Sequence, residues 1–431
     1  MKAIASCLAS IIGDENAVCV WENIPVERQK LILEAIASPS PPHCIVYPST
    51  TQQLAAIIAE AYRNKWRVLL CGSGSKLNWG GLVKSADIVV STERINQPIE
   101  HAVGDLTVTV GAGMKFSQLQ TILANSKQFL AIDPATPESA TIGGIVATAD
   151  TGSLRQRYGS VRDQLLGITF VRADGQIAKA GGRVVKNVAG YDLMKLFTGS
   201  FGTLGAIAQV TFRLYPFLEA SGTVVLTGEA TAVEQAADIL RGSALTPTQA
   251  DLLSPQLVSR LELGQGLGLI ARFQSIAESV KEQSNQLLEV GKQLGLQGKI
   301  YSEADEADLW LILREQMHSS PSESVITCKI GVLPTSAVKV LTEVEMGWIH
   351  IASGLGVLRF EGENTVDKVL ETRNLCQTNG GFLTILAAPV TVKERLDVWG
   401  YTGNALQIMR RIKEQFDAGY ILSPGRFVGG I

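Results

Sequence analysis

The sequence lacks the marks of several common protein classes. Only four of its 431 residues are histidine, and its six cysteines form no CxxC pair and no metal-ligand spacing. We therefore expect free thiols in a reducing compartment, with neither disulfides nor a cysteine-held metal. Lys and Arg number 38 against 41 Asp and Glu, a net charge of −3, which gives no sign of a nucleic-acid or anionic-membrane partner.

Long hydrophobic runs are also missing. No apolar run approaches the roughly 18 residues of a membrane-spanning helix. Residues 1–12 are mildly apolar, but the stretch is short and contains two serines, so we do not expect a signal peptide. These absences predict a cytoplasmic protein. Association with a membrane would then require a partner subunit.

Glycine and apolar residues are what the sequence has in plenty. The 42 glycines make up nearly a tenth of the chain, and 46% of the residues are hydrophobic, enough for packed cores. A single hydrophobic core stops growing at about 250–300 residues. We therefore expect two domains, one interrupting the other.

The distribution of apolar runs predicts how these domains are built. Residues 44–47, 51–64 and 68–71 read as strand, helix and strand, a pattern typical of parallel strands. Short strand-like runs alternate with glycine-rich turns over residues 141–216, which suits an antiparallel sheet. The strand–helix units of residues 220–390 indicate one or two split βαβ (ferredoxin-like) sheets. We predict an N-terminal helical extension (1–43), a first domain (44–217), a second α+β domain (218–400) and a tail that returns to the first domain (401–431).

The glycine-rich segments are the main functional signal. Gly72-Ser73-Gly74-Ser75-Lys76 follows a buried-looking strand, and such a loop can cradle a phosphate with its backbone N–H groups. An ordinary tight turn is an equally good interpretation. Gly111-Ala112-Gly113 resembles the start of a dinucleotide fingerprint, but Phe116 stands where the third glycine belongs, which favours a structural strand-to-helix turn.

Two more glycine-rich segments follow, at residues 140–159 and 186–205. Taken singly, each can simply mark a loop. Several such loops beside strands, with Lys and Arg close by, suit a long ligand with a diphosphate in its middle. No Walker-type loop is present, which argues against an NTPase.

Taken together, these segments resemble the FAD-binding domain of the vanillyl-alcohol-oxidase (PCMH-type) flavoproteins. The resemblance rests on Tyr47-Pro48-Ser49-Thr50, 72–80, Thr141-Ile142-Gly143-Gly144, 157–163 and 199–205. Residues 104–113 and 186–192 are similar to the FAD-binding E subunit of bacterial glycolate oxidase/dehydrogenase. The resemblance implies a two-subdomain PCMH-type FAD-binding domain with a ferredoxin-like cap.

The same resemblance implies a set of FAD-binding residues. The first glycine loop would hold the pyrophosphate, the region around Thr141 would line the isoalloxazine and ribityl chain, and Arg426 of Ser423-Pro424-Gly425-Arg426 would supply a positive charge. The implied cofactor-binding residues are Gly72, Ser73, Gly74, Ser75, Lys76, Gly80, Pro134, Ala135, Thr136, Thr141, Gly143, Gly144, Arg157, Tyr158, Gly159, Gly205, Ile207 and Arg426.

Two departures from the family pattern refine this prediction. Covalent members carry a histidine in the first glycine loop, and Gly72–Lys76 has none, so we expect FAD to be held non-covalently. Related D-lactate dehydrogenases and the sister catalytic subunit carry a Gly-Asp-Gly-Asn-Leu-His segment in the cap. Here Leu355 and Arg359 replace the Asp and the final His, and neither can ligate a metal. We therefore expect no metal site.

The catalytic residues stay unassigned at this stage. Oxidation of a 2-hydroxy acid needs a base for the hydroxyl proton and a cation for the carboxylate. His318, one helical turn after Arg314, is the best base in the second domain, although a solvated helix end is the simpler interpretation. His350 reads as a satisfied core histidine, His43 and His101 lie next to loops, and Arg157 and Lys186 suit flavin-side charge.

Three hypotheses follow for the function. The first is an FAD subunit of a glycolate (2-hydroxy acid) dehydrogenase complex, relaying electrons beside a catalytic flavoprotein subunit and an iron–sulfur subunit. The absence of a cysteine cluster places the iron–sulfur centre in a partner. The second is a self-sufficient FAD-dependent dehydrogenase of a 2-hydroxy acid or sugar acid. The third is a structural or assembly subunit with a degenerate flavin site.

Overall fold

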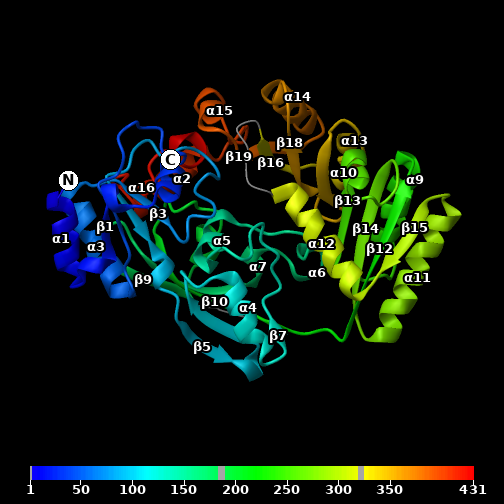
Figure 1. The fold of residues 1–431 in the computed structure, drawn as a ribbon, viewed down its shortest axis with the longest axis horizontal. Coiled ribbons are helices and arrows are strands. Elements are labelled where there is room, and N and C mark those ends of the chain that lie inside the picture. Colours follow the sequence, from blue (N-terminus) through cyan, green and yellow to red (C-terminus); the bar gives the residue numbers. More distant parts are fainter. Residues whose placement is uncertain (1, 183–189, 319–324) are drawn as a thin grey trace. The chain divides into compact units, whose positions relative to one another are not determined.

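The computed structural model describes residues 2–182, 190–318 and 325–431. They form two compact units. Unit 1 comprises Met1–Thr151, Ser160–Pro216 and Lys393–Ile431, and unit 2 comprises Gly152–Gly159 and Phe217–Val392 (Figure 1). The chain thus returns to unit 1 at Lys393, where we had expected the return at residue 401.

Unit 1 contains a four-stranded sheet in the order β1-β2-β4-β3. Strands β2 and β3 each run parallel to β4, and β1 pairs antiparallel with β2. The strands predicted at 44–47 and 68–71 therefore lie parallel in one sheet, with β4 between them. Residues 1–43 contribute strand β1 as well as helices. The elements are α1 (Lys2–Ile12), β1 (Val18–Val20), α2 (Val26–Leu33), β2 (Cys44–Val46), α3 (Thr51–Asn64), β3 (Val68–Cys71) and β4 (Ile88–Ser91).

This sheet is buried on both faces, which explains why its strands read as continuous apolar runs. Because side chains alternate along a strand, Val68 joins one core and Leu69 the other. The first core packs against the apolar stripe of α3, with Leu54 fully buried, and the second packs against Ile32 of α2. The residues before the cofactor-loop candidate at 72 are thus fixed from both sides.

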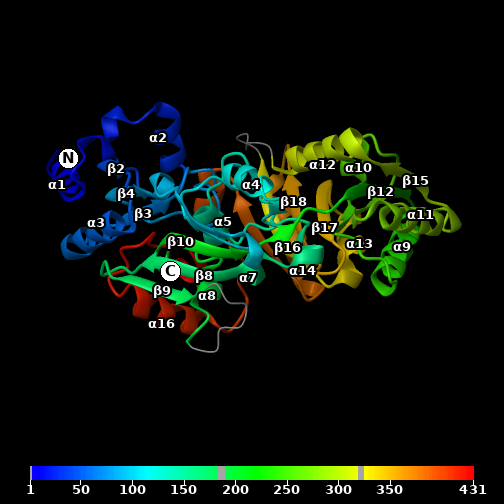
Figure 2. The same cartoon turned by 90° about the horizontal axis from the view of Figure 1, so that it is seen from below.

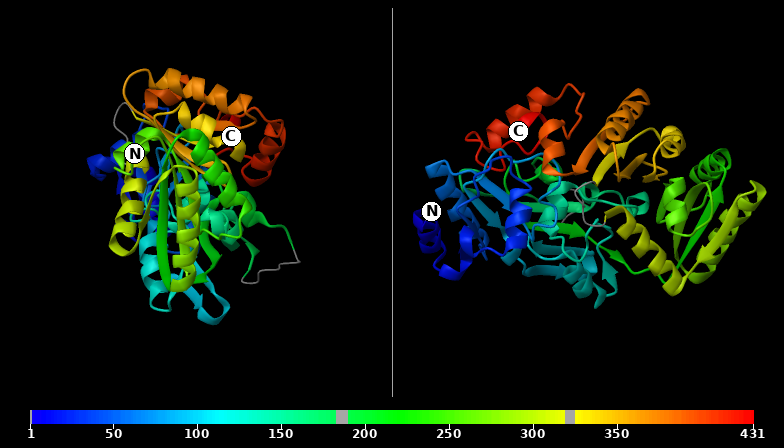
Figure 3. Two further views of the ribbon diagram at one scale, coloured as in Figure 1. Left: turned by 90° about the vertical axis from the view of Figure 1, so that its right-hand side faces the viewer. Right: turned by 45° about the horizontal axis from the view of Figure 1, so that its top comes forward.

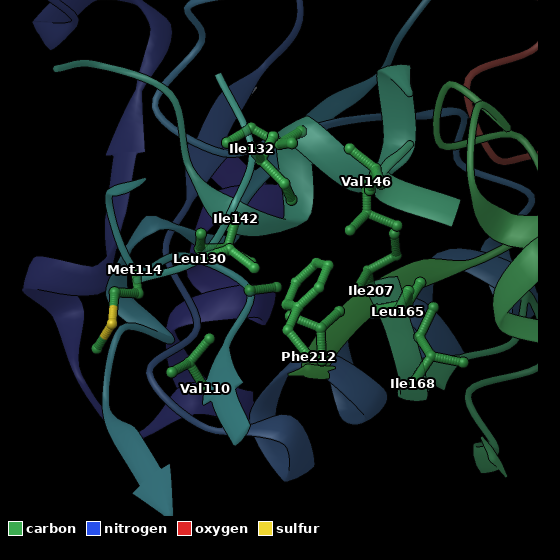
Figure 4. Close-up of a cluster of buried hydrophobic side chains, with 14 of the residues drawn as sticks. Val110, Met114, Leu130, Ile132, Ile142, Val146, Leu165, Ile168, Ile207 and Phe212 are labelled. Atoms are coloured by element: carbon green, nitrogen blue, oxygen red, sulfur yellow. The ribbon is translucent and has the colours of Figure 1, made fainter. Parts of the chain in front are cut away.

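A second sheet of unit 1 is entirely antiparallel, in the order β5-β6-β10-β8-β9. The antiparallel sheet predicted within residues 141–216 is confirmed. One face packs against helices α4, α5 and α8, and Figure 4 shows Ile142 and Val146 of α5 near Phe212 in this core. The elements are β5 (Pro98–Ala102), β6 (Thr107–Gly111), α4 (Phe116–Ala124), α5 (Ile142–Thr148), α7 (Val161–Gln164), β8 (Leu165–Val171), β9 (Ile177–Gly181), α8 (Leu193–Phe197) and β10 (Ala206–Arg213).

The C-terminal segment belongs to unit 1 and lies against the first sheet. Leu422 forms a parallel bridge with Val68, and Figure 3 shows the red C-terminal part of the chain next to the blue N-terminal part. Helix α16 (Leu406–Phe416) precedes this segment, and α15 (Val390–Arg395) begins at the end of unit 2. A short ribbon of β7 (Gln128–Phe129) and β11 (Tyr215–Pro216) completes unit 1.

Unit 2 is built from two ferredoxin-like halves joined edge to edge. Its eight-stranded antiparallel sheet has the order β15-β12-β14-β13-β17-β18-β16-β19, and the halves meet where β13 pairs with β17. Helices α11 and α12 lie on opposite sides of the sheet (Figure 2), α11 against Leu226 and α12 near Val225. The expected ferredoxin-like α+β architecture is confirmed.

The elements of unit 2 have the following bounds. They are α6 (Arg155–Tyr158), β12 (Ala220–Gly228), α9 (Ala230–Gly242), β13 (Gln249–Leu253), α10 (Pro255–Arg260), β14 (Leu267–Ser275), α11 (Ala277–Gln293), β15 (Gln297–Tyr301), α12 (Glu303–His318), β16 (Ile326–Gly331), α13 (Ala337–Thr342), β17 (Met346–His350), β18 (Leu355–Phe360), α14 (Thr365–Thr378) and β19 (Phe382–Ala387).

Candidate functional site

The loop that follows β3, residues 72–80, is the centre of the candidate site. Its start is fixed by hydroxyl groups: Ser91 Oγ donates to the Gly72 carbonyl at 2.9 Å, and Ser73 Oγ donates to the Ser139 carbonyl at 2.5 Å. Gly74 has φ +92°, a backbone conformation that glycine adopts without strain. The loop therefore has one defined shape, set by β4 and by the segment before α5.

Four consecutive backbone N–H groups of this loop, those of Ser73 to Lys76, have no acceptor within the described residues. Polar backbone groups in folded proteins are nearly always paired with protein, water or ligand. A run of N–H groups around a glycine of positive φ forms a concave nest that binds anions. The geometry of the loop is therefore suited to binding an anion.

This loop opens into a cavity of unit 1 with about 660 Å³ of space, part of it open to solvent. Eleven of the residues predicted from sequence line it: Gly72, Ser73, Gly74, Ser75, Lys76, Thr141, Gly143, Gly144, Gly205, Ile207 and Arg426. The lining residues that sequence reasoning missed are Leu70, Cys71, Leu77, Thr92, Ala147, Thr148, Phe201, Gly202 and Ala206.

Lys76 brings a positive charge to the cavity. Its Nζ lies 3.0 Å from Asp150 Oδ2, and both side chains are nearly fully buried. Asp150 also accepts from the backbone N–H of Ala135 at 3.1 Å. The carboxylate thus ties the predicted residues around Ala135 to Lys76, although Ala135 itself does not line the cavity. Asp150 was missed by sequence reasoning because nothing local distinguishes it.

Arg426 brings a second charge, from the C-terminal segment. Its Nη2 donates to the carbonyl groups of Lys76, Leu77 and Trp79, and burial lowers the pKa of its guanidinium to about 10. Within the described residues it forms no ion pair with a carboxylate, and its buried Nε has no partner. The expected positive charge from the Ser-Pro-Gly-Arg turn therefore lies at the cavity, uncompensated by a protein anion.

The apolar part of the cavity includes Phe201 and Cys71. Phe201 has φ +53°, which is strained for a residue with a side chain, and its ring packs edge-on against Trp399 at 5.0 Å between centroids. Burial raises the pKa of the Cys71 thiol to about 11, so the thiol is protonated at neutral pH. All six cysteines are free.

The other predicted residues lie elsewhere. Gly80, Pro134, Ala135 and Thr136 belong to unit 1 but do not line the cavity. Arg157, Tyr158 and Gly159 belong to unit 2, and their role toward a cofactor stays a prediction. Lys186, a candidate for flavin-side charge, lies outside the described residues, as do Asn187, Val188 and Ala189.

The histidines do not assemble a second site in the described residues. His101 pairs with Gln128 at 2.9 Å, and His318 packs against Trp348. His350 is buried in β17, as expected, and its Nδ1 lies 2.5 Å from Asp251 Oδ1. Ser153 Oγ donates to the other oxygen of Asp251, so the short segment 152–159 is fastened to β13 of the same unit. This carboxylate partner of His350 was not predicted.

The segment that departs from the metal-binding pattern forms strand β18. Leu355 begins the strand, and the Arg359 guanidinium pairs with Glu361 Oε1 at 2.6 Å. No cluster of three or more His, Cys, Asp or Glu side chains suited to a metal occurs in the ranges that the structure describes. In those same ranges no helix is long and apolar enough to cross a membrane.

Comparison with known proteins gives a family match for the part of the chain that contains the loop at residues 72–80. Residues 42–181 match the family described as FAD binding domain. D-lactate dehydrogenase of Archaeoglobus fulgidus is 35% identical over 173 residues, 40% of this chain and 38% of that protein. The glycolate oxidase subunit GlcD of Bacillus subtilis is 29% identical over 221 residues, 51% of this chain and 47% of that protein. The chain thus spans less than half the length of these two relatives.

Two further comparisons extend over nearly the whole chain. D-2-hydroxyglutarate dehydrogenase of Stutzerimonas stutzeri is 25% identical over 427 residues, 89% of this chain and 90% of that protein. The crystal structure of p-cresol methylhydroxylase with substrate bound has a TM-score of 0.76 at 16% identity, covering 99% of this chain and 96% of that one. This chain therefore has the PCMH-type fold, and its residues 42–181 match an FAD binding domain. FAD is its cofactor. The relatives named above are two dehydrogenases and a glycolate oxidase subunit.

Proposed function

We propose that this chain is a flavin-dependent oxidoreductase of 2-hydroxy acids whose unit 1 cavity holds FAD non-covalently. One observation carries the proposal: four unpaired N–H groups, from Ser73 to Lys76, line a cavity, and their loop lies within residues 42–181, which match the FAD binding domain. The residues present fit the cofactor, because a diphosphate needs several donors at once and the loop presents four N–H groups in sequence.

Different residues of the cavity have different roles in binding FAD. The N–H groups of residues 73–76 donate to the diphosphate, and Lys76 adds a charge whose position Asp150 fixes. When bound, FAD supplies the acceptor for the hydride that leaves the substrate carbon. Arg426, buried and without a carboxylate, favours any negative charge that develops beside it. Phe201, Leu70 and Ile207 exclude water from the apolar part of the cavity.

The finer proposal is that the chain is the FAD subunit of a glycolate dehydrogenase complex, together with a catalytic flavoprotein subunit and an iron–sulfur subunit. Its support is the segment at β18, where Leu355 and Arg359 stand in place of the Asp and His of self-sufficient relatives. A carboxylate and an imidazole would be needed there to ligate a metal. Oxidation of glycolate to glyoxylate would then take place in the complex, with this chain taking part in electron relay.

A second candidate is a self-sufficient dehydrogenase of one 2-hydroxy acid. The alignment with D-2-hydroxyglutarate dehydrogenase over 89% of this chain favours it.

An anaerobic absorbance spectrum of the purified chain tests these proposals. Glycolate, D-lactate and D-2-hydroxyglutarate are added in turn, and the flavin band near roughly 450 nm, a property of the cofactor, is followed. A band that persists with the chain alone but bleaches when the partner subunits are present supports the FAD subunit. Bleaching of the isolated chain by one acid supports the self-sufficient enzyme. A chain that takes up no FAD would overturn both and leave a structural subunit with a degenerate site.

A further inference from the structure

Residues 76–79 turn four successive carbonyl groups toward two buried cations. Arg426 Nη2 lies 3.0 Å from the Lys76 carbonyl, 3.1 Å from that of Leu77 and 3.3 Å from that of Trp79. The remaining carbonyl, that of Asn78, accepts from Lys393 Nζ. Four consecutive peptide groups are thus fixed by cations that come from the last 39 residues of the chain.

Lys393 is buried without a carboxylate partner. The residue is only 7% exposed, and it forms no ion pair within the described residues. A fully buried lysine is rare unless it is paired, because desolvation of an ammonium is expensive. Lys393 Nζ donates to the Asn78 carbonyl, so the contact that this buried ammonium makes is with the loop.

Two charged groups face Lys393 from neighbouring elements. Arg426 approaches from the C-terminal segment, and Glu34 lies at the C-cap of α2, where it is also 3.9 Å from Lys30. Burial and the Arg426 charge lower the pKa of Lys393 to about 7, and Glu34 opposes them. The charge on Lys393 therefore changes near neutral pH, unlike that of an ordinary lysine.

The residues that follow this loop also form backbone hydrogen bonds with distant segments of the chain. The Ala37 N–H donates to the Val83 carbonyl, and the Lys84 N–H donates to the Pro424 carbonyl. Lys393 is the first residue of unit 1 after the chain returns from unit 2. Residues 76–84 are thus contacted by three distant parts of the chain: the N-terminal region at Ala37, the start of the last unit 1 segment at Lys393, and the C-terminal residues 424–426. The start of the loop is held by β4 and the segment before α5, and its end is held by Lys393 and Arg426, more than 300 positions away.

We propose that Lys393 is a positioning residue for FAD: with Arg426 it holds the carbonyls of residues 76–79 in place and keeps the N–H groups of Ser73–Lys76 presented to the diphosphate. In its protonated form it also adds a positive charge beside the loop, which favours an anionic ligand. This inference rests on the proposed cofactor site, and it does not depend on which substrate is oxidised.

The test is titration of FAD-stripped protein with FAD, followed by flavin fluorescence, at pH 6 and pH 8.5. Four proteins are compared: wild type, Lys393→Met, Lys393→Arg and Lys30→Met. Lys30 is exposed and also near Glu34, so Lys30→Met removes the same charge without touching the loop. Arg stays protonated at both pH values.

The expected results distinguish a positioning role from a merely structural one. For wild type and Lys30→Met, we expect the Kd for FAD to rise about tenfold from pH 6 to pH 8.5. Lys393→Met should bind at least tenfold more weakly than wild type at pH 6 and lack the pH dependence. Lys393→Arg should bind tightly at both pH values.

The proposal is overturned if the Kd of wild type for FAD is the same at pH 6 and pH 8.5. It is also overturned if the Kd of Lys393→Arg rises with pH as much as that of wild type. Both results are informative even if Lys393→Met fails to fold. A Kd of Lys393→Met for FAD within twofold of the wild-type value at pH 6 would overturn the proposal as well. Wild type that binds no FAD would instead overturn the cofactor site itself, a distinguishable result.

Discussion

The hydroxyl oxygen of Thr141 lies 2.0 Å from the position that a Cβ on residue 72 would occupy. Gly72 thus lets β3 end directly against the N-terminus of α5, where Thr141 Oγ1 caps the helix by accepting from the Gly144 N–H. One contact, between Gly72 and Thr141, therefore fixes both the start of the loop at residues 72–80 and the first turn of α5. No larger residue fits at position 72 while Thr141 keeps its place.

This contact predicts the effect of Gly72→Ala. The methyl group displaces the Thr141 side chain, so we expect overpacking and loss of the cap to cost about 1–3 kcal/mol of stability. FAD affinity should fall at least tenfold, because the N–H groups of the loop move with it. Thr141→Ala removes the clashing oxygen, so the double variant Gly72→Ala/Thr141→Ala should lose less stability than the two single losses summed. Urea unfolding of all four proteins measures this coupling, and strict additivity would contradict the contact.

The buried pair of Lys413 and Asp417 predicts a large loss of stability. Lys413 Nζ donates to Asp417 Oδ2 at 2.6 Å and to the carbonyls of Thr203 and Leu422, with both charged side chains fully buried. Removing one partner leaves a buried charge unpaired, so Lys413→Met should cost about 3–5 kcal/mol in urea unfolding at pH 7. Arg411→Met, on the exposed part of α16, is the matched control and should stay within about 0.5 kcal/mol of wild type. Equal midpoints for the two variants would refute the role given to the pair.

The lowered pKa of Lys393 predicts a pH-dependent stability. The pKa is about 7 in the folded protein against an ordinary value of 10.5, so between these values the unfolded chain binds more protons. Stability from this group therefore rises with pH across that window, by at most roughly 1.4 kcal/mol per pH unit. Lys393→Met lacks this dependence. In FAD-free protein, the unfolding free energy of wild type minus that of Lys393→Met should increase from pH 7 to pH 9. A difference that is constant with pH would show that Lys393 titrates normally.

Much of the fold was predictable because its signals are local. The parallel strands on either side of α3 are visible in the sequence as short apolar runs with a helical stretch between them. The two ferredoxin-like halves are visible as a repeated strand–helix spacing. The loop at Gly72–Lys76 is visible for the same reason, since small residues directly follow a buried strand. Eleven of the 18 predicted binding residues line one cavity of unit 1.

What sequence reasoning missed depends on distant neighbours. Phe201 and Ala147 line the cavity together because the Phe201 N–H donates to the Ala147 carbonyl of α5, and no local pattern marks either residue. Lys393 stands in an unremarkable helix, and only the folded chain brings it to the Asn78 carbonyl, 315 positions earlier. Likewise, Asp251 pairs directly with His350 because β13 and β17 are neighbours, although they lie 99 positions apart.

The central claim is that the cavity of unit 1 holds FAD non-covalently, and filling that cavity tests it most directly. Ala147, on α5, lines the cavity, and Ala124, at the end of α4, is exposed and serves as the matched control. The measurement is the flavin absorbance retained per chain by wild type, Ala147→Phe and Ala124→Phe, with circular dichroism to show that each variant is folded.

Wild type and Ala124→Phe should retain close to one FAD per chain, released into the supernatant by acid precipitation, while folded Ala147→Phe retains none. Full retention by folded Ala147→Phe would place the cofactor elsewhere, and flavin that stays with the acid precipitate would contradict non-covalent binding.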